Sequence, residues 1–401
     1  MKGKIIPLNF RTTEDSVTGR QVIRMTPPHV ICHRNYFYQK CFTRDGSKLI
    51  FGGGFEGHWN YYLLDLAAQQ AVQLTDGPGD NTFGGFLSDD DRTLWYVKNN
   101  RQLRRVDLAT REEQVVYTVD DDWVAYGTWV ANSDCSKLVG IEIKKSDWRP
   151  LTDWSKFRAF YFTQPECRLI NIDLHSGERR VVLQEKRWLG HPIYRPFDDQ
   201  TIAFCHEGPR DAIDARMWLI NADGSNMRNV RQHQPGESFT HEFWVPDGSA
   251  LYYVAHREND PHRYLYRADP TTLDNRQLLT IPPCSHLMSN YDGSLVVGDG
   301  APHHTGDIQL NDPFIWVFDI AADKQTAVCR HDSTWKVIEG ERQATHPHPS
   351  FSPDNRWVLF TSDKEGMPAL YAALEHSEAA SDAAAHAIMT TDTVKKEAAV
   401  E

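Results

Sequence analysis

The sequence predicts an all-β fold, a seven-bladed β-propeller of four-stranded antiparallel blades. Three observations lead to this prediction. A turn that contains an aspartate, followed by a strand of alternating apolar and polar residues, occurs seven times along the 401 residues, and a second strand follows each copy. The turn aspartates recur at a regular interval, since 45 residues separate Asp45 from Asp90 and also Asp247 from Asp292. Units of four strands and roughly 40–45 residues are typical of propeller blades.

Each repeat is interpreted as strands because β-branched and aromatic residues alternate with polar residues in it. The seven turn-and-strand segments are 42–51, 86–97, 129–143, 194–205, 243–254, 289–300 and 351–360. Six units continue through a polar turn into a further strand, whereas the last unit lacks one after Leu374. Two stacked β-sandwiches are the alternative fold, but they do not explain so regular a unit.

The missing strand of the last unit is expected near the N-terminus. Residues 22–26 read Val-Ile-Arg-Met-Thr and resemble the strand at 72–75 of the first unit. An N-terminal strand that closes the last blade would remove an open sheet edge, which otherwise invites aggregation. We therefore expect one propeller domain over 1–375 and an Ala/Glu-rich tail, helical or disordered, over 376–401.

The composition narrows the class of protein. The chain has 55 acidic residues against 43 lysines and arginines, a formal net charge of −12, which argues against a nucleic-acid-binding protein. No apolar run approaches the ~20 residues that a membrane span needs. Residues 1–16 lack the pattern of a secretory signal, and the seven cysteines include no C-x-x-C pair. These features predict a cytoplasmic protein without a nucleic-acid or membrane partner.

The 18 histidines fall partly in phase with the repeat. In a propeller, the first strand of each blade lines the central channel, and the starts of the first and third strands share one face of the ring. His241, His286 and His348 each stand six residues before a turn aspartate, and His191 stands seven before Asp198. Blades four to seven are thus predicted to place histidines at one mouth of the channel.

The sharpest local pattern is Gln343-Ala-Thr-His346-Pro-His348. Two histidines at positions i and i+2 of a strand point to one side, within reach of a single cation. His286 of the neighbouring blade and the amide oxygen of Gln343 would complete a set of three histidines and one glutamine. Such ligands suit Mn²⁺, Zn²⁺, Fe²⁺ or Ni²⁺ rather than Ca²⁺ or a thiolate-bound zinc. Surface histidines without a metal are the alternative for an isolated H-x-H.

Two further residues are candidates for catalysis. His241 is interpreted either as a general base, because an imidazole titrates near neutral pH, or as a channel histidine hydrogen-bonded to a neighbouring blade. Arg216, at the start of a third strand, either forms an ordinary salt bridge or binds a substrate carboxylate bidentately. His191 and His206 are candidates for substrate contact on the same face.

A long insertion in the third unit, 144–165, is expected on this face as well. Its aromatic residues Trp148, Trp154 and Phe157 either stack on a sugar ring or only hold the loop in place. Both interpretations stay open at the level of the sequence.

Three segments resemble the oligogalacturonate lyases of pectin-degrading bacteria. These segments are Thr240-His-Glu-Phe-Trp244, Ser285-His-Leu-Met288 and the run of ten residues that begins at Gln343. The resemblance implies a cytoplasmic seven-bladed propeller that cleaves short, often unsaturated, oligogalacturonides to 5-keto-4-deoxyuronate. It also implies a bound divalent metal, for which we expect Mn²⁺. The family's metal ligands would fall on His286, Gln343, His346 and His348, its base on His241 and its assisting arginine on Arg216.

Two other classes of function remain as alternatives. One is a non-enzymatic interaction scaffold of the WD40 or TolB-like type, which should present an exposed apolar or charged patch rather than converging imidazoles. The other is a metal-dependent hydrolase of a sugar or lactone, which would use a metal-bound water and yield no unsaturated product. The residues by themselves lead to a propeller with a metal site, and the lyase activity follows from the resemblance.

Overall fold

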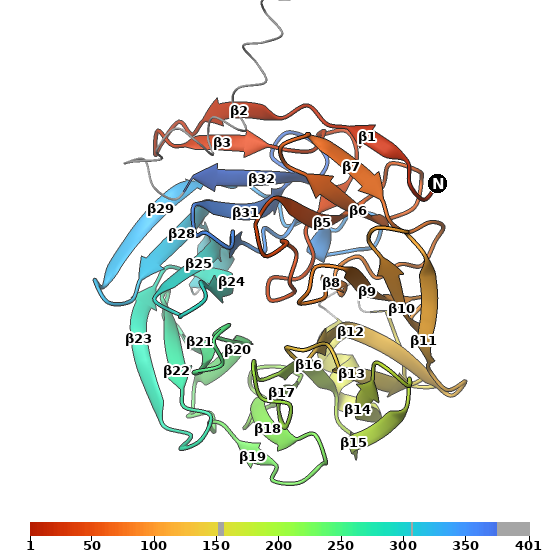
Figure 1. Ribbon diagram of the computed structural model, residues 1–401. Helices are drawn as coiled ribbons and strands as arrows, with labels where there is room; N and C mark the ends of the chain where they lie inside the picture. Colours follow the sequence, from red (N-terminus) through yellow and green to blue (C-terminus); the bar gives the residue numbers. More distant parts are fainter. Residues whose placement is uncertain (151–155, 306–307, 375–401) are drawn as a thin grey trace, which may run out of the picture.

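The computed structural model describes residues 1–150, 156–305 and 308–374. Seven antiparallel sheets stand like blades around a central axis, which confirms the seven-bladed β-propeller (Figure 1). The expected tail at 376–401 and the side chain of Trp154 lie outside the described residues. Within these ranges, no helix is long and apolar enough to cross a membrane.

The four main strands of each blade run from the centre of the ring outwards, as the first three blades illustrate (Figure 1). Blade 1 holds β4 (Cys32–His33), β5 (Lys48–Gly53), β6 (Asn60–Asp65) and β7 (Gln70–Gln73). Blade 2 holds β8 (Phe86–Leu87), β9 (Thr93–Lys98), β10 (Gln102–Asp107) and β11 (Glu113–Thr118). Blade 3 holds β12 (Trp123–Ala131), β13 (Lys137–Lys144), β14 (Cys167–Asp173) and β15 (Arg179–Glu185).

The remaining blades repeat this order. Blade 4 holds β16 (Leu189–Tyr194), β17 (Thr201–His206), β18 (Met217–Asn221) and β19 (Arg228–Asn229). Blade 5 holds β20 (Glu237–Trp244), β21 (Leu251–Arg257), β22 (Arg263–Ala268) and β23 (Asn275–Ile281). Blade 6 holds β24 (Cys284–Ser289), β25 (Leu295–Gly300), β28 (Phe314–Asp319) and β29 (Lys324–Arg330). Blade 7 holds β30 (Ser350–Phe351), β31 (Trp357–Ser362), β32 (Ala369–Leu374) and β3 (Gln21–Arg24).

The ring is closed by an N-terminal strand, as expected. Strand β3 pairs antiparallel with β32, with Val22 opposite Ala373 and Ile23 opposite Ala372. The side chains of Val22 and Ile23 are buried. The last blade is therefore completed by residues from the other end of the chain.

Two blades carry a fifth strand in addition to the four that the sequence predicts. Strand β1 (Ile5–Pro7) adds to the outer edge of β7 in blade 1, and β2 (Arg11–Glu14) adds to β3 in blade 7. All four residues of β2 are exposed. Such a strand buries little and shows no apolar alternation, because backbone hydrogen bonds to an otherwise open sheet edge hold it in place.

The hydrophobic cores lie between successive blades. Met217 and Leu219 of blade 4, for example, pack in one buried cluster with Phe239 and Tyr253 of blade 5. Because a neighbouring blade covers each face of a sheet, the middle strands are buried on both sides, and all six residues of β17 are buried. Burial of each large apolar side chain contributes about 1.5–3 kcal/mol to the free energy of folding.

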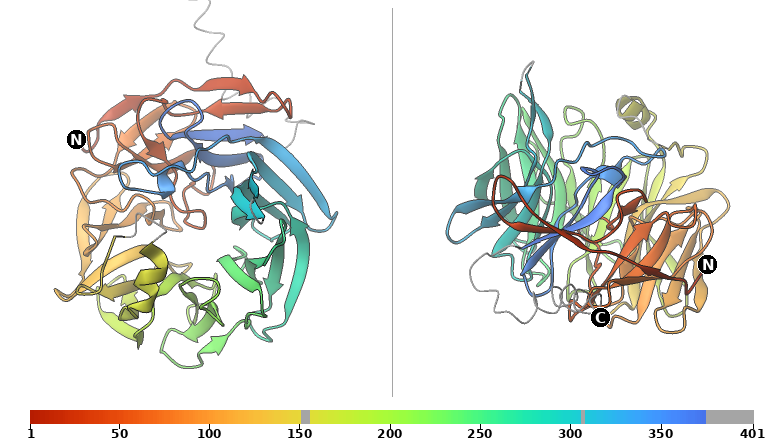
Figure 2. Two further views of the ribbon diagram at one scale, coloured as in Figure 1. Left: turned by 180° about the vertical axis from the view of Figure 1, so that it is seen from behind. Right: turned by 90° about the horizontal axis from the view of Figure 1, so that it is seen from above.

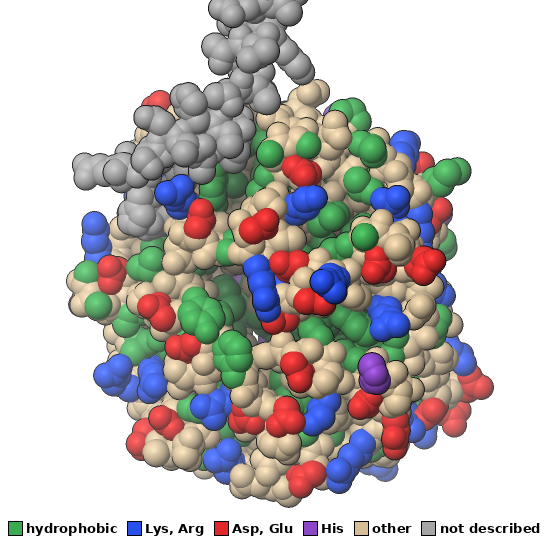
Figure 3. Space-filling view, in the orientation of Figure 1, with side chains coloured by type: hydrophobic (Ala, Val, Ile, Leu, Met, Phe, Trp, Pro, Cys, Tyr) green, Lys and Arg blue, Asp and Glu red, His purple; other side chains and the backbone are tan. Residues whose placement is uncertain are grey.

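One face of the ring carries the long insertions. Helix α1 (Phe157–Phe162) lies between β13 and β14, and the hairpin of β26 (Pro302–Thr305) and β27 (Ile308–Asn311) lies between β25 and β28. Both connect a second strand to a third strand, so they share the face on which the inner strands begin (Figure 2, left). On the opposite face, shown in Figure 3, acidic and basic side chains are mixed and histidine is sparse.

Candidate metal centre and active site

The inner strands of blades 3 to 6 each contain a shift in register. In blades 4 and 5 the shift includes His191 and His241, whose φ angles of 46° and 54° lie in the left-handed region. His348, just before β30, has a φ of 47°. Residues other than glycine adopt this conformation at a cost of order 1–3 kcal/mol. A bulge turns a side chain out of the alternating pattern of its strand, and here it aims histidines toward the centre of the ring.

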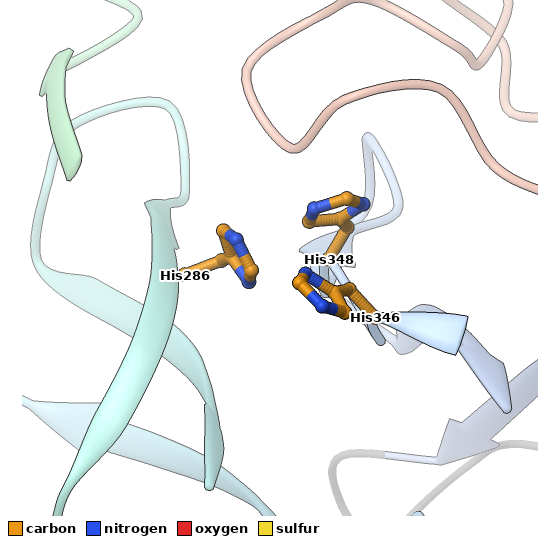
Figure 4. A group of neighbouring side chains, drawn as sticks. All are labelled: His286, His346 and His348. Atoms are coloured by element: carbon orange, nitrogen blue, oxygen red, sulfur yellow. The ribbon is translucent and has the colours of Figure 1, made fainter. Parts of the chain in front are cut away.

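Three histidines from two neighbouring blades converge at this centre. His286, His346 and His348 each offer one ring nitrogen, and these three atoms lie within 4.8 Å of one another. Figure 4 shows His286, on β24, facing the other two imidazoles across a gap. Imidazole nitrogens bind zinc at about 2.0–2.1 Å, so two that share such an ion lie at most roughly 4 Å apart. A small closing movement would bring all three to one cation.

The local conformation of the Gln343-to-His348 segment differs from the expectation. Gln343–Thr345 form a 3-10 turn, η2, and His348 has a left-handed backbone rather than an extended one. The two imidazoles therefore do not converge through the alternation of a strand. Pro347 still anchors the segment, because its carbonyl accepts a hydrogen bond of 2.9 Å from the Thr361 backbone N–H.

Several polar atoms of this group lack a hydrogen-bond partner within the described chain. They are Gln343 Oε1, His346 Nδ1 and His348 Nε2, all buried from solvent. An unpaired buried polar atom costs roughly 1–3 kcal/mol, so three of them within the six residues from Gln343 to His348 are suited to bind a ligand. The residues present thus fit a divalent cation of borderline character.

Asp299, on β25, forms hydrogen bonds to both His286 of blade 6 and His348 of blade 7. Its Oδ1 accepts a 2.6 Å hydrogen bond from the His286 backbone N–H, and its Oδ2 lies 2.9 Å from His286 Nδ1. The same Oδ2 accepts a 3.2 Å bond from the His348 backbone N–H. With Nδ1–H directed at Asp299, the other nitrogen of His286 is left for a metal. Asp299 was not predicted from the sequence. The only feature that could have indicated it is its position as an acidic residue in an otherwise apolar strand.

The three imidazoles are neutral at pH 7. Burial, followed by the charge of His191, lowers the pKa of His286 to about 3. Burial, followed by the charge of His286, holds the pKa values of His346 and His348 well below their usual range. Neutral imidazole is the form that binds a metal.

His241 lies beside this group. The ring centres of His241 and His286 are 4.7 Å apart, and His241 Nδ1 has no hydrogen-bond partner in the described residues. Burial, then the charges of His286 and His191, hold the pKa of His241 well below its usual range. A neutral, unpaired imidazole next to a metal group can accept a proton.

Arg216 belongs to a buried ion-pair network. Its Nε lies 3.0 Å from Glu242 Oε2, and its Nη1 lies 3.0 Å from Glu207 Oε2. His191 Nδ1 stands 3.1 Å from the other oxygen of Glu242. Burial opposes the charge of Glu242, but Arg216 and His191 outweigh it and hold the pKa of Glu242 well below its usual range. The salt-bridge interpretation of Arg216 is thus realised, with two glutamates that sequence reasoning missed.

Comparison with known proteins identifies the family. The family model described as oligogalacturonate lyase matches residues 1–378. The oligogalacturonate lyase of Dickeya dadantii (strain 3937) is 65% identical over 378 residues, which cover 93% of this chain and 97% of that protein. The chain belongs to the oligogalacturonate lyase family. The oligogalacturonide lyase of Pectobacterium atrosepticum is 64% identical over the same shares of the two chains.

A solved structure agrees with this assignment. An oligogalacturonate lyase in complex with manganese superposes with a TM-score of 0.90 at 66% identity, covering 94% of this chain and 98% of that one. The oligogalacturonate lyase family therefore includes a member of this fold with bound manganese.

The centre of this lyase-family propeller also contains a segment that the sequence did not reveal. The first strand of blade 1 is interrupted after His33, and residues 34–41 leave the sheet before the isolated bridge at Phe42. The segment brings Tyr36 within 5.0 Å of His348, and Phe37 within 5.6 Å of His286, between ring centres. These aromatic rings pack against the histidine group and shield it on one side.

His206 does not join this group. Its Nε2 lies 3.1 Å from Glu185 Oε2, its Nδ1 lies 3.3 Å from Arg187, and its ring packs on Trp218. His191, in contrast, lies near the centre, with Nε2 3.5 Å from the Tyr36 hydroxyl. Of the two histidines suggested for substrate contact, the structure brings only His191 near the metal group.

The blade 3 insertion packs against protein. Trp148 lies 5.8 Å from Tyr126, and Phe157 lies 4.7 Å from Trp188, between ring centres. For these two residues the structure favours the interpretation that they hold the loop.

Proposed function

We propose that this chain cleaves short oligogalacturonides by metal-assisted β-elimination, with 5-keto-4-deoxyuronate as product. The observation that carries the proposal is the convergence of three neutral histidines, two of them buried and His346 half-buried, beside His241 in a member of the oligogalacturonate lyase family. We propose Mn²⁺ as the ion, held by His286, His346, His348 and Gln343. When bound, a divalent cation would supply Lewis-acid neutralisation of the uronate carboxylate.

His241 is proposed as the base. Elimination requires removal of the proton on C5, which is acidic because it adjoins the carboxylate, and departure of the oxygen on C4. His241 has a free Nδ1 and a neutral ring, so it would accept the C5 proton. A positioned base of this kind contributes about 10²–10⁴-fold to the rate.

Arg216 is proposed to orient substrate or to stabilise the charge that develops as the C4 oxygen leaves. Its guanidinium is held in place by Glu207 and Glu242, so a substrate would meet a donor that is already oriented. Tyr36 and Phe37 exclude water from the inner side of the group. His191 would contact substrate from the neighbouring blade.

The compartment is proposed to be the cytoplasm. All seven cysteines are free, and six of them are buried. Free thiols of this number suit a reducing compartment, and a cytoplasmic lyase would act on oligomers that have already been taken up.

The test is turnover of trigalacturonate by the purified chain with Mn²⁺, with and without a chelator. We expect metal-dependent formation of a keto-deoxyuronate in the thiobarbiturate assay, and its loss in His346→Ala. His175→Ala, at an exposed turn of blade 3, is the matched control and should retain activity. Release of saturated galacturonate instead would indicate a hydrolase. If the protein neither binds metal nor turns over substrate, a non-enzymatic interaction scaffold would be the better interpretation of its function.

A further inference from the structure

We propose that Arg210, His256 and Arg263 form an anion subsite that binds the carboxylate of the sugar next to the reacting one. The proposal rests on the proposed lyase function, because an oligogalacturonide carries one carboxylate on each sugar. The candidate metal centre would take only the carboxylate of the sugar that loses its C5 proton.

Arg263 is a buried cation without a carboxylate partner. It stands at the start of β22 and is 9% exposed. Its hydrogen bonds in the described chain run from Nη1 to the backbone oxygens of Asp260 (3.4 Å) and His262 (3.0 Å). The carboxylate of Asp260 instead binds His262 Nδ1 at 3.1 Å and the hydroxyl of Tyr264. Burial of an unpaired charge is costly, which indicates that an anion completes this site.

His256 adds an unpartnered donor beside Arg263. The two residues are directly opposite in the β21–β22 ladder, so their side chains lie on the same side of the sheet. His256 is 7% exposed, and its Nε2 lies 2.8 Å from Thr240 Oγ1. Its Nδ1 is buried and has no hydrogen-bond partner in the described residues. If the Thr240 hydroxyl donates to Nε2, then Nδ1 carries a proton that can bind an anion.

The position of this pair is next to the proposed active site. Val254 and Leu265 lie two residues from His256 and Arg263 along their strands, and both pack into the cluster shared with blade 6. His256 and Arg263 therefore face blade 6, whose inner strand β24 carries His286. Thr240, which is bonded to His256, directly precedes the proposed base His241.

Arg210 supplies a second positive charge from the loop between β17 and β18. Helix α1 braces this loop, because Arg158 binds both oxygens of Asp211 at 2.7 and 2.9 Å and the Tyr161 hydroxyl donates to the Ala212 carbonyl at 3.0 Å. Arg210 itself has no ion pair with a carboxylate within the described residues. This loop joins the second strand of blade 4 to the third, so it lies on the face of the ring at which β22 of blade 5 begins with Arg263. Burial and then the charge of Arg210 lower the pKa of Arg263 to about 10.

Within the described residues none of these three side chains forms an ion pair with a carboxylate, and the nearby Asp260 carboxylate is bonded to His262 and Tyr264, so the group suits an anion even in a protein of net charge −12. The planar guanidinium matches a carboxylate bidentately, whereas a neutral sugar hydroxyl would not offset either charge. In this proposal, helix α1 of the blade 3 insertion has the function of positioning the loop that carries Arg210.

The test compares binding of one sugar with binding of two. Galacturonate and digalacturonate are titrated calorimetrically into the full-length, Mn²⁺-loaded His241→Asn chain, in which turnover is slowed. Arg263→Gln and Arg210→Gln are each expected to weaken binding of digalacturonate roughly 10- to 100-fold, the range of a charge-assisted hydrogen bond. Binding of galacturonate should change by no more than about twofold, as for a surface substitution. Arg276→Gln, an exposed arginine on β23 of the same blade, is the matched control and should alter neither.

An unchanged affinity for digalacturonate in both variants, or an equal loss for the two ligands, would overturn the subsite. Arg210 is exposed, so its variant keeps the test valid if Arg263→Gln does not fold, and Arg263→Lys should recover part of the affinity. The two proposals fail separately. Wild-type protein that cleaves digalacturonate without the expected binding pattern would contradict the subsite alone, whereas the expected pattern without cleavage by wild type would contradict the lyase proposal alone.

Discussion

Asp299 binds His286 twice, through the backbone N–H at 2.6 Å and through ring Nδ1 at 2.9 Å. Its side chain is fully buried, and it also accepts the backbone N–H of His348 from the next blade. One carboxylate thus sets the ring orientation of one proposed ligand and the backbone position of another. Carboxylates that hold metal-binding histidines in this way tune the affinity of a site.

Asp299→Asn is expected to weaken Mn²⁺ binding by about 10- to 100-fold, because the amide cannot hold Nδ1–H as the carboxylate does. Calorimetric titration of Mn²⁺ into the purified variant measures this loss. Asp323→Asn, at an exposed left-handed turn position, is the control and should bind Mn²⁺ as wild type does. An unchanged affinity in Asp299→Asn would mean that Asp299 only fixes the fold.

His241→Asn is expected to lower kcat by about 10²–10⁴-fold, because the proposed base is lost. Asparagine tolerates the left-handed backbone at this position, so the bulge should survive. The affinity for Mn²⁺ should stay within about twofold of wild type, as for a residue outside the ligand set. Retention of more than about a tenth of kcat would contradict the role of base.

Glu242→Gln is expected to lower the free energy of unfolding by about 3 kcal/mol, the lower end for breaking a buried ion pair, since Arg216 keeps Glu207. Urea unfolding measures the change. Glu258→Gln, an exposed glutamate of blade 5, serves as the comparison and should shift stability by less than about 0.5 kcal/mol. Equal stability of the two variants would show that the network of Arg216 contributes nothing to the fold.

His331 makes the stability of the protein depend on pH. Its Nδ1 accepts a 2.9 Å hydrogen bond from the Ser333 backbone N–H, and its Nε2 lies 2.9 Å from the Gly300 carbonyl. Burial lowers its pKa to about 4, whereas in the unfolded chain it is about 6.5. Between these values the unfolded chain binds a proton that the folded protein does not, so stability is lost as the pH falls from about 6.5 toward 4.

In His331→Gln, the free energy of unfolding should fall less steeply between pH 6.5 and 4, by about 1.4 kcal/mol per pH unit, than it does in wild type. Urea unfolding at several pH values between 4 and 7 measures the slope. His175→Gln, whose side chain is exposed, should leave the slope unchanged. An identical slope in His331→Gln and wild type would contradict the assignment of a buried neutral imidazole.

Much of the fold could be predicted because each blade is a local pattern. Turn aspartates such as Asp247 and Asp292 mark the repeat, and the strand at 22–26 has the same alternation as the outer strands of other blades. The fifth strands could not be predicted, since β1 and β2 are short, mostly exposed and held by backbone bonds to distant edges.

The candidate metal group was partly predictable for the same reason. His286 and His348 stand at a constant distance from their turn aspartates, so the repeat places both at equivalent points of two blades. The expectation that His346 and His348 converge as positions i and i+2 of a strand was wrong, because a 3-10 turn before them and a left-handed His348 bring the imidazoles together instead.

The sequence by itself determined the number of blades and the positions of the histidines along the repeat, because these depend on the order of residues within about one blade. It also indicated the closure of the ring, because the last unit lacks a strand and residues 22–26 have the pattern of one. Only the tertiary structure decided the partners of those histidines. Asp299 and His348 are 49 residues apart in sequence, and Glu242 and Arg216 are 26 apart. Such pairs meet only because the ring brings neighbouring blades into contact, and no local pattern of residues records that contact.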